Sequence, residues 1–147
     1  MLDLIHLSAT FSIGILGGAL LTEACILVPY WRRMDPSDFL RLHGEMGPSL
    51  FRYFAPLTVI AVALPVCSGL LELANAGATN GRILAGGLSL AALMIFFIYF
   101  KKANAKFAAH SIPENALADE LARWASWHWA RTILVLIAFA FSIIGTI

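Results

Sequence analysis

Residues 124–147 read WASWHWARTILVLIAFAFSIIGTI, and this stretch decides the fold class. Three tryptophans, a histidine and an arginine lead into sixteen residues without a single charge. An α-helix rises about 1.5 Å per residue, so such a run is long enough to cross the roughly 30 Å hydrocarbon core of a bilayer. Tryptophan and arginine gather at membrane–water boundaries, so the stretch also predicts where this helix leaves the membrane.

The composition of the whole chain supports a membrane protein. Its 147 residues are 60% hydrophobic and only 13% charged, with a mean hydropathy of +0.81. Soluble domains are about 45–50% apolar and about 25% charged. The net charge of +1 gives no indication of nucleic-acid binding. We therefore expect one transmembrane domain over residues 1–147, with the lipid bilayer as its main surroundings and no nucleic-acid partner.

Four apolar segments are long enough to span a membrane, and backbone groups in lipid must be satisfied within each segment, which requires helices. The spans are predicted at about 4–30, 51–74, 83–100 and 125–147. The fold class is therefore all-α, an integral membrane four-helix bundle. In the first span, Gly14 and Gly18 have the spacing that lets two helices pack closely.

Polar connections at 31–50 and 101–123 separate these spans. Asp35-Pro36 is typical of a helix start and Gly47-Pro48 of a helix end, which predicts a short interfacial helix between the first two spans. Ser111-Ile-Pro-Glu114 fits a capping box. We expect the fourth helix to begin there and to extend well into the cytoplasm before it reaches its span.

The distribution of positive charge predicts the orientation. The chain has ten lysines and arginines, and only Arg82 lies outside the two long connections and their flanks. The other nine are Arg32, Arg33, Arg41, Arg52, Lys101, Lys102, Lys106, Arg123 and Arg131. By the positive-inside rule, 31–50 and 101–123 are cytoplasmic and both termini lie outside a cell (inner) membrane.

The two cysteines, Cys25 and Cys67, fall in apolar runs and, by the predicted topology, near opposite faces of the bilayer. They are therefore too far apart to bond to each other within one chain. We expect two free, buried thiols that behave as small hydrophobic side chains.

Glu23 is the ionisable residue that stands out in the first span, where a charged side chain is costly and is expected to face the bundle interior. On the fourth helix Trp124, His128 and Arg131 lie at i, i+4 and i+7 and therefore share one face. Glu23 and Arg131 have similar predicted depths. The sequence leaves two interpretations open: a functional site, or a structural ion pair beside an aromatic belt.

A metal site is a further interpretation of the same end of the bundle. Imidazole and carboxylate groups bind copper, zinc or non-haem iron. The candidate ligands are His128, Glu23 and His43. The spacing matches no established metal motif, so the cofactor is unknown. Haem is less expected, because His6 and His128, the histidines near the spans, lie at opposite faces.

The fourth helix also carries a resemblance to a known family. Its pattern consists of Trp124, His128, Arg131 and Thr132, ahead of an alanine-rich apolar helix. This pattern resembles the small four-helix, anthrone-oxygenase-like membrane family, most bacterial members of which have no assigned activity. An acidic residue, a proline and a basic residue of that family correspond here to Glu23, Pro29 and Arg32, with a wider interval between the first two. The resemblance implies an oxidoreductase for aromatic or lipophilic substrates, since some fungal relatives oxidise anthrones to anthraquinones with oxygen.

These observations lead to two hypotheses. In the first, a lipophilic substrate enters a pocket between the first and fourth helices. His128 is then a metal ligand or general base, Glu23 a second ligand or proton acceptor, and Arg131 the group that stabilises an anionic intermediate. Trp124 and Trp127 stack on the flat substrate. In the second, the chain is a non-enzymatic accessory subunit that binds a partner membrane protein, or forms a homo-oligomer, through its glycine-rich first helix.

Overall fold

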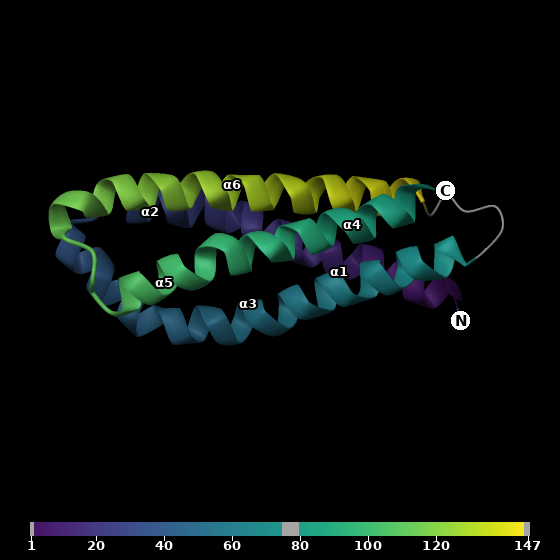
Figure 1. Cartoon of the computed structure of the whole chain (residues 1–147), viewed down its shortest axis with the longest axis horizontal. Coiled ribbons are helices and arrows are strands. Elements are labelled where there is room, and N and C mark those ends of the chain that lie inside the picture. Colours follow the sequence, from purple (N-terminus) through teal and green to yellow (C-terminus); the bar gives the residue numbers. More distant parts are fainter. Residues whose placement is uncertain (1, 75–79, 146–147) are drawn as a thin grey trace.

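The computed structural model describes residues 2–74 and 80–145, and within them the chain is helical throughout, with no strand. Figure 1 shows long helical rods lying side by side, with the two ends of the chain at the same end of the molecule. The first rod consists of α1 (Leu2–Thr22), the π-helical turn η1 (Glu23–Leu27) and α2 (Val28–Trp31). The second rod is α3 (Pro36–Leu73). The third consists of α4 (Asn80–Ile95), the π-helical turn η2 (Phe96–Phe100) and α5 (Lys101–Ala108), and the fourth is α6 (Glu114–Ile144).

The rods pack as an up-and-down bundle, since α4 contacts α3 and α6, and α1 contacts the same two helices from the other side. Two clusters of buried side chains fill the bundle. The cluster towards the termini is built from small and aliphatic residues such as Ile13, Ala85 and Ala138. The other cluster is rich in aromatic rings, among them Phe100 and Phe107. The predicted all-helical class with four long apolar helices is thus confirmed.

All four rods are long and apolar enough to cross a membrane. Their outer surface carries large hydrophobic side chains, including Phe11 at 72% exposure and Ile98 at 69%. A soluble protein rarely exposes such side chains in quantity, whereas lipid tails accommodate them. Cys25 and Cys67 also face outwards. The prediction that they are free is confirmed, but the prediction that they are buried is wrong, because both side chains are exposed on the outer surface of the bundle.

Glycines set the closest helix approaches. A Cβ atom added to Gly86 of α4 would lie 2.9 Å from the carbonyl oxygen of Pro65 in α3. One added to Gly81 would lie 2.9 Å from the carbonyl oxygen of Phe141 in α6. Without these two glycines, α4 would have to move away from both neighbours.

On α1, the close-packing pair differs from the predicted one. A Cβ atom on Gly14 would lie 3.0 Å from the Phe139 ring, and one on Gly17 would lie 3.3 Å from Leu136. Gly18 has no atom within 4 Å. The prediction of Gly14 with Gly18 is therefore wrong in its second member. Gly14 and Gly17, three residues apart, lie on the face of α1 that meets α6, whereas Gly18 lies on the outer side.

The predicted separate interfacial helix is also wrong. Asp35 and Pro36 begin a helix as expected, but this helix continues through Gly47-Pro48 to Leu73 as one element. A proline inside a helix costs about 3 kcal/mol. Buried side chains on both sides of Pro48, from Phe39 to Val62, pack into the same bundle and outweigh this cost.

The α5–α6 connection ends one helix and starts the next without the predicted capping box. Helix α6 begins at Glu114 without a side-chain cap, and the Ser111 hydroxyl instead donates to the carbonyl oxygen of Lys106. His110, with φ of 49°, closes α5 in the left-handed conformation. The backbone N–H groups of His110 and Ser111 donate to Phe107 and Lys106, which is the Schellman pattern of hydrogen bonds.

Candidate functional site

The candidate site lies in the half of the bundle far from the termini, where both π-helical turns border it. Such turns widen the helix by one residue and are frequent at functional sites. The turn η1 begins with Glu23, which is buried. The turn η2 ends with Phe100, which is 1% exposed. Both side chains approach His128 on α6.

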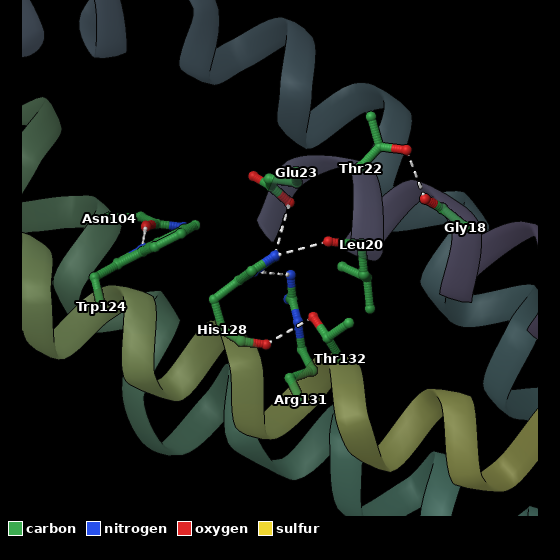
Figure 2. A network of polar contacts seen from close by, with 9 residues as sticks. All are labelled: Gly18, Leu20, Thr22, Glu23, Asn104, Trp124, His128, Arg131 and Thr132. Carbon is green, nitrogen blue, oxygen red and sulfur yellow. Dashed lines mark hydrogen bonds and ion pairs between the residues drawn. The ribbon is translucent and has the colours of Figure 1, made fainter. Parts of the chain in front are cut away.

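Three ionisable side chains meet here, with the imidazole in the middle (Figure 2). His128 Nε2 lies 3.8 Å from Glu23 Oε2 and 3.0 Å from the carbonyl oxygen of Leu20. On the other side of the ring, Arg131 Nη2 lies 3.4 Å from His128 Nδ1. Glu23 and Arg131 therefore do not form a direct ion pair within 4.0 Å in the described part of the chain. Instead, both contact His128, which is fully buried.

The partners of His128 define its hydrogen-bonding roles. The Leu20 carbonyl only accepts, so Nε2 carries a hydrogen and donates to it. The guanidinium of Arg131 only donates, so Nδ1 is the acceptor. The neutral Nε2–H form of the ring thus satisfies both contacts. The His128 carbonyl accepts from the Thr132 hydroxyl at 2.8 Å, so the last residue of the W…H..RT pattern holds the backbone of the same turn.

Aromatic rings fix the position of this imidazole. Trp124 stacks on His128 with ring centroids 5.0 Å apart and an angle of 8° between the planes. The Trp124 indole N–H donates to Asn104 Oδ1 at 3.0 Å, which ties α6 to α5 (Figure 2). Phe100 meets Trp124 edge-on and carries the Arg131 guanidinium 4.6 Å above its ring.

A cavity of about 50 Å³ adjoins this cluster on the side of Glu23. Glu23 and His43 are the ionisable residues that line it, and apolar side chains and aromatic rings form the rest of its wall, among them Trp31, Trp124 and Met46. His43 is held by stacking on Phe39, with ring centroids 5.7 Å apart. The structure thus brings His43, predicted only as a metal ligand, to the same cavity as Glu23.

Arg131 points away from this cavity. It lines a second, smaller space of about 10 Å³ between α1, α3, α4 and α6, together with Thr58 and Ser89. Its Nε atom is buried and has no hydrogen-bond partner among the described residues. Arg131 therefore contacts His128 at Nδ1, the ring nitrogen away from Glu23, and it does not line the cavity beside Glu23.

Trp127 lies elsewhere. It is 36% exposed and stacks on Tyr99, with ring centroids 5.5 Å apart, on the outer side of the bundle. It is not among the residues that line the cavity beside Glu23. Of the two tryptophans predicted to stack on a substrate, only Trp124 borders this cavity.

The predicted metal ligands are not gathered around one point. His128 Nε2 lies 3.8 Å from Glu23 Oε2, whereas His43 lines the cavity beside Glu23, which His128 does not line. Within residues 2–74 and 80–145, no group of three or more His, Cys, Asp or Glu side chains is arranged to hold a metal ion. A metal bound by all three predicted ligands, whether copper, iron or zinc, would require these side chains to move.

Sequence reasoning missed Asn104 and Phe100. Asn104 lies in the polar segment KKANAKF, whose composition indicates only a solvated connection. Because α5 continues the third rod beyond the predicted span, this face turns towards α6. The sequence feature that could have predicted this buried face is the i, i+3, i+7 spacing of Phe100, Ala103 and Phe107, all of which are buried.

A second polar cluster lies at the opposite end of the bundle. His6 Nδ1 lies 2.7 Å from the Ser68 hydroxyl, and Arg82 Nη1 donates to Glu72 Oε2 at 2.7 Å. These contacts tie α1 to α3 and α3 to α4. They explain why Arg82, the one basic residue outside the two long connections and their flanks, is tolerated there, since Glu72 compensates its charge.

The chain matches no protein-family model, and no curated protein or solved structure is significantly similar to it. The resemblance to the anthrone-oxygenase-like family therefore depends on the residues of the W…H..RT pattern and on Glu23, Pro29 and Arg32 alone. The chemistry of the chain has to be inferred from the geometry of the site.

Proposed function

We propose that this chain is an integral membrane oxidoreductase that uses oxygen to oxidise a flat, lipophilic aromatic substrate. The observation that carries the proposal is the cavity beside Glu23, where a buried carboxylate and an imidazole line an otherwise aromatic and apolar wall. Buried ionisable groups within membrane helices are usually functional. The resemblance of the W…H..RT pattern to the anthrone-oxygenase-like family supports the same class of reaction.

In this proposal Glu23 is the general base. It removes a proton from the methylene carbon of an aromatic ketone such as an anthrone, and the resulting enolate carries the electrons that oxygen accepts. Oxygen adds to that carbon, and a returned proton completes a hydroperoxide. Loss of the second C–H proton and cleavage of the O–O bond then give the quinone and water. In this proposal His43, which lines the same cavity, hydrogen-bonds to the ketone oxygen as negative charge develops there.

His128 and Arg131 act on Glu23 rather than on the substrate. The His128 Nε2–H group, directed at the Leu20 carbonyl, lies 3.8 Å from the Glu23 carboxylate and limits where that carboxylate can point. Arg131 fixes the opposite ring nitrogen. Rigid support of this kind lets a catalytic group keep a productive geometry.

The cavity must widen to admit such a substrate. Its volume of about 50 Å³ is large enough for only one or two waters, whereas ligand pockets usually measure about 300–1,000 Å³. Met46 forms part of the wall, is 46% exposed and has a flexible side chain. We propose that the substrate arrives through the membrane boundary and displaces Met46 and the neighbouring Leu50.

The same proposal includes the orientation of the chain. Helix α3 has 38 residues and α6 has 31, which correspond to about 57 Å and about 46 Å. Both exceed the roughly 30 Å of a hydrocarbon core. With the positive charges on the cytoplasmic side, the ends of α3, α5 and α6 around the cavity extend into the cytoplasm, and both termini lie outside.

The test is oxygen consumption by the purified protein in lipid nanodiscs with an anthrone as substrate. Replacing Glu23 with Gln should lower turnover by about 100-fold or more, the usual contribution of a general base. Glu120→Gln is the matched control, because Glu120 lies on the same half of the bundle but binds Tyr99 and Arg123, away from the cavity. Full turnover by the Glu23→Gln or the His128→Ala variant would refute the mechanism. Absence of oxygen consumption by the unaltered protein with any aromatic ketone would refute the reaction class.

A second candidate function is that of an accessory subunit, and one observation favours it. Gly18 lies on the outer side of α1 with no atom within 4 Å, which leaves room for a helix of another protein. Gly18→Leu should then release a co-purifying membrane protein without changing the stability of the isolated bundle. If Gly18→Leu releases no partner, the accessory role is excluded for this face.

A further inference from the structure

A groove of about 490 Å³ runs along the outer side of the bundle between η1–α2 and α6. It is separate from the cavity beside Glu23, so a ligand bound in it is independent of the proposed function. Small side chains form its floor: Ala24 of η1 lies on one side, and Ala125 and Ser126 of α6 lie on the other. Because these side chains are short, the two helices leave a channel that their own residues do not fill.

Two cations border one end of this groove. Arg32 and Arg33 follow directly after α2, line the groove and are exposed. Neither has a carboxylate within 4.0 Å in residues 2–74 and 80–145. The exposed Arg41 and Arg123, in contrast, each pair with an acidic neighbour on their own helix. The positive charge beside the groove is therefore available to an external anion.

The groove changes character along its length. On α6 it extends from Ala122 to Trp129, which is about 10 Å along the helix axis. Ala122 lies towards the polar start of α6, whereas Trp129, at 39% exposure, lies one helical turn before Ile133 in the apolar part of α6. A ligand that fits this groove therefore has an anionic group at one end and hydrocarbon at the other.

We infer that this groove is a binding site for an anionic phospholipid. Its phosphate lies against Arg32 and Arg33, and the start of one acyl chain lies along Ala24 and Ser126 towards Trp129. A second copy of the chain fits less well, because a symmetric contact through this groove would bring the same uncompensated arginines of both copies together. Basic pockets between membrane helices on the cytoplasmic side are a known way of holding such headgroups.

The test is native mass spectrometry of the full chain in mild detergent, with equal amounts of phosphatidylglycerol and phosphatidylcholine of the same acyl composition. The unaltered protein should retain phosphatidylglycerol in preference to phosphatidylcholine. The double variant R32Q/R33Q should bind phosphatidylglycerol about tenfold to thirtyfold more weakly, from the contribution of two arginines near a headgroup. The matched control K101Q/K102Q removes two exposed charges from the same half of the bundle, outside the groove, and should bind as the unaltered protein does.

A second variant tests the groove itself without changing charge. Ser126 is exposed and lines the floor, so Ser126→Trp fills the channel and should abolish retention of phosphatidylglycerol. If R32Q/R33Q does not fold, this variant alone decides the question. Equal losses in R32Q/R33Q and K101Q/K102Q, or unchanged retention in the Ser126→Trp variant, would overturn the inference. A lipid-free dimer that Ser126→Trp dissociates would also overturn it and would identify the groove as an interface between copies.

Discussion

The contact between α3 and α4 gives the most quantitative prediction. In the Gly86→Ala variant, the added methyl group would lie 2.9 Å from the Pro65 carbonyl oxygen and 3.2 Å from the Val66 Cα atom. Both are backbone atoms, so no side-chain rotation relieves the overlap and the helices must separate. Gly87, the next residue on α4, has no atom within 4 Å. Gly87→Ala is therefore a matched control with the same chemical change.

The two variants should differ in stability by about 1–3 kcal/mol, the usual cost of overpacking a well-packed site. Exchanging glycine for alanine within a helix contributes about 1 kcal/mol of added stability in both variants, so this term cancels in the comparison. Gly87→Ala should therefore be slightly more stable than the unaltered protein, and Gly86→Ala as stable or less stable.

Steric trapping in bicelles measures the free energy of unfolding of each variant directly. Circular dichroism of the folded state verifies that both remain helical before trapping. Equal unfolding free energies for the Gly86→Ala and Gly87→Ala variants, within about 0.5 kcal/mol, would refute the argument that the backbones of α3 and α4 touch at Gly86.

Three further predictions concern other contacts. Trp124→Phe keeps a ring beside His128 but removes the donor to Asn104, so the free energy of unfolding should fall by about 0.5–1.5 kcal/mol; Asn104→Leu in the same background should then add little. Glu72→Leu leaves the largely buried Arg82 guanidinium without its 2.7 Å partner and should destabilise the bundle by about 3–5 kcal/mol, a loss that thermal unfolding in detergent would detect. Lys102→Cys in a cysteine-free background should react with a membrane-impermeant maleimide only after the inner side of the membrane is made accessible; labelling of intact cells would reverse the proposed orientation.

The helices were predictable because hydropathy alone determines them. Apolar runs of this length have no other stable form in lipid, so four rods and their approximate positions follow from the sequence. Helix ends and breaks were less predictable. Gly47-Pro48 has the local chemistry of a helix end, yet α3 continues through it. The packing that overrides this signal joins residues distant in the sequence, which a local pattern does not reveal.

The candidate site was predictable in its members but not in their arrangement. Depth along the helices placed Glu23, His128 and Arg131 together, and they do lie together. The depth of a residue along its helix does not tell where its side chain points, however. In the structure the His128 imidazole lies between the Glu23 carboxylate and the Arg131 guanidinium. The position of His43 at the cavity beside Glu23 depends on α3 lying against α5 and α6, and that packing could not be predicted from the spacing of histidines.

The turn η1 has a consequence for insertion and deletion in this chain. Each residue of a regular α-helix advances the side chains by about 100° around the axis. A π-helical turn holds one residue more than a regular turn, and here that residue keeps the faces before and after it in phase with the bundle. Deleting a single residue between Ala24 and Leu27 would therefore restore a regular α-helical turn, and Glu23 and the glycine face that meets α6 should keep their directions. Deleting one residue between Gly18 and Thr22, in the regular part of α1, would instead rotate Gly14 and Gly17 by about 100° relative to Glu23 and turn the glycine face away from α6.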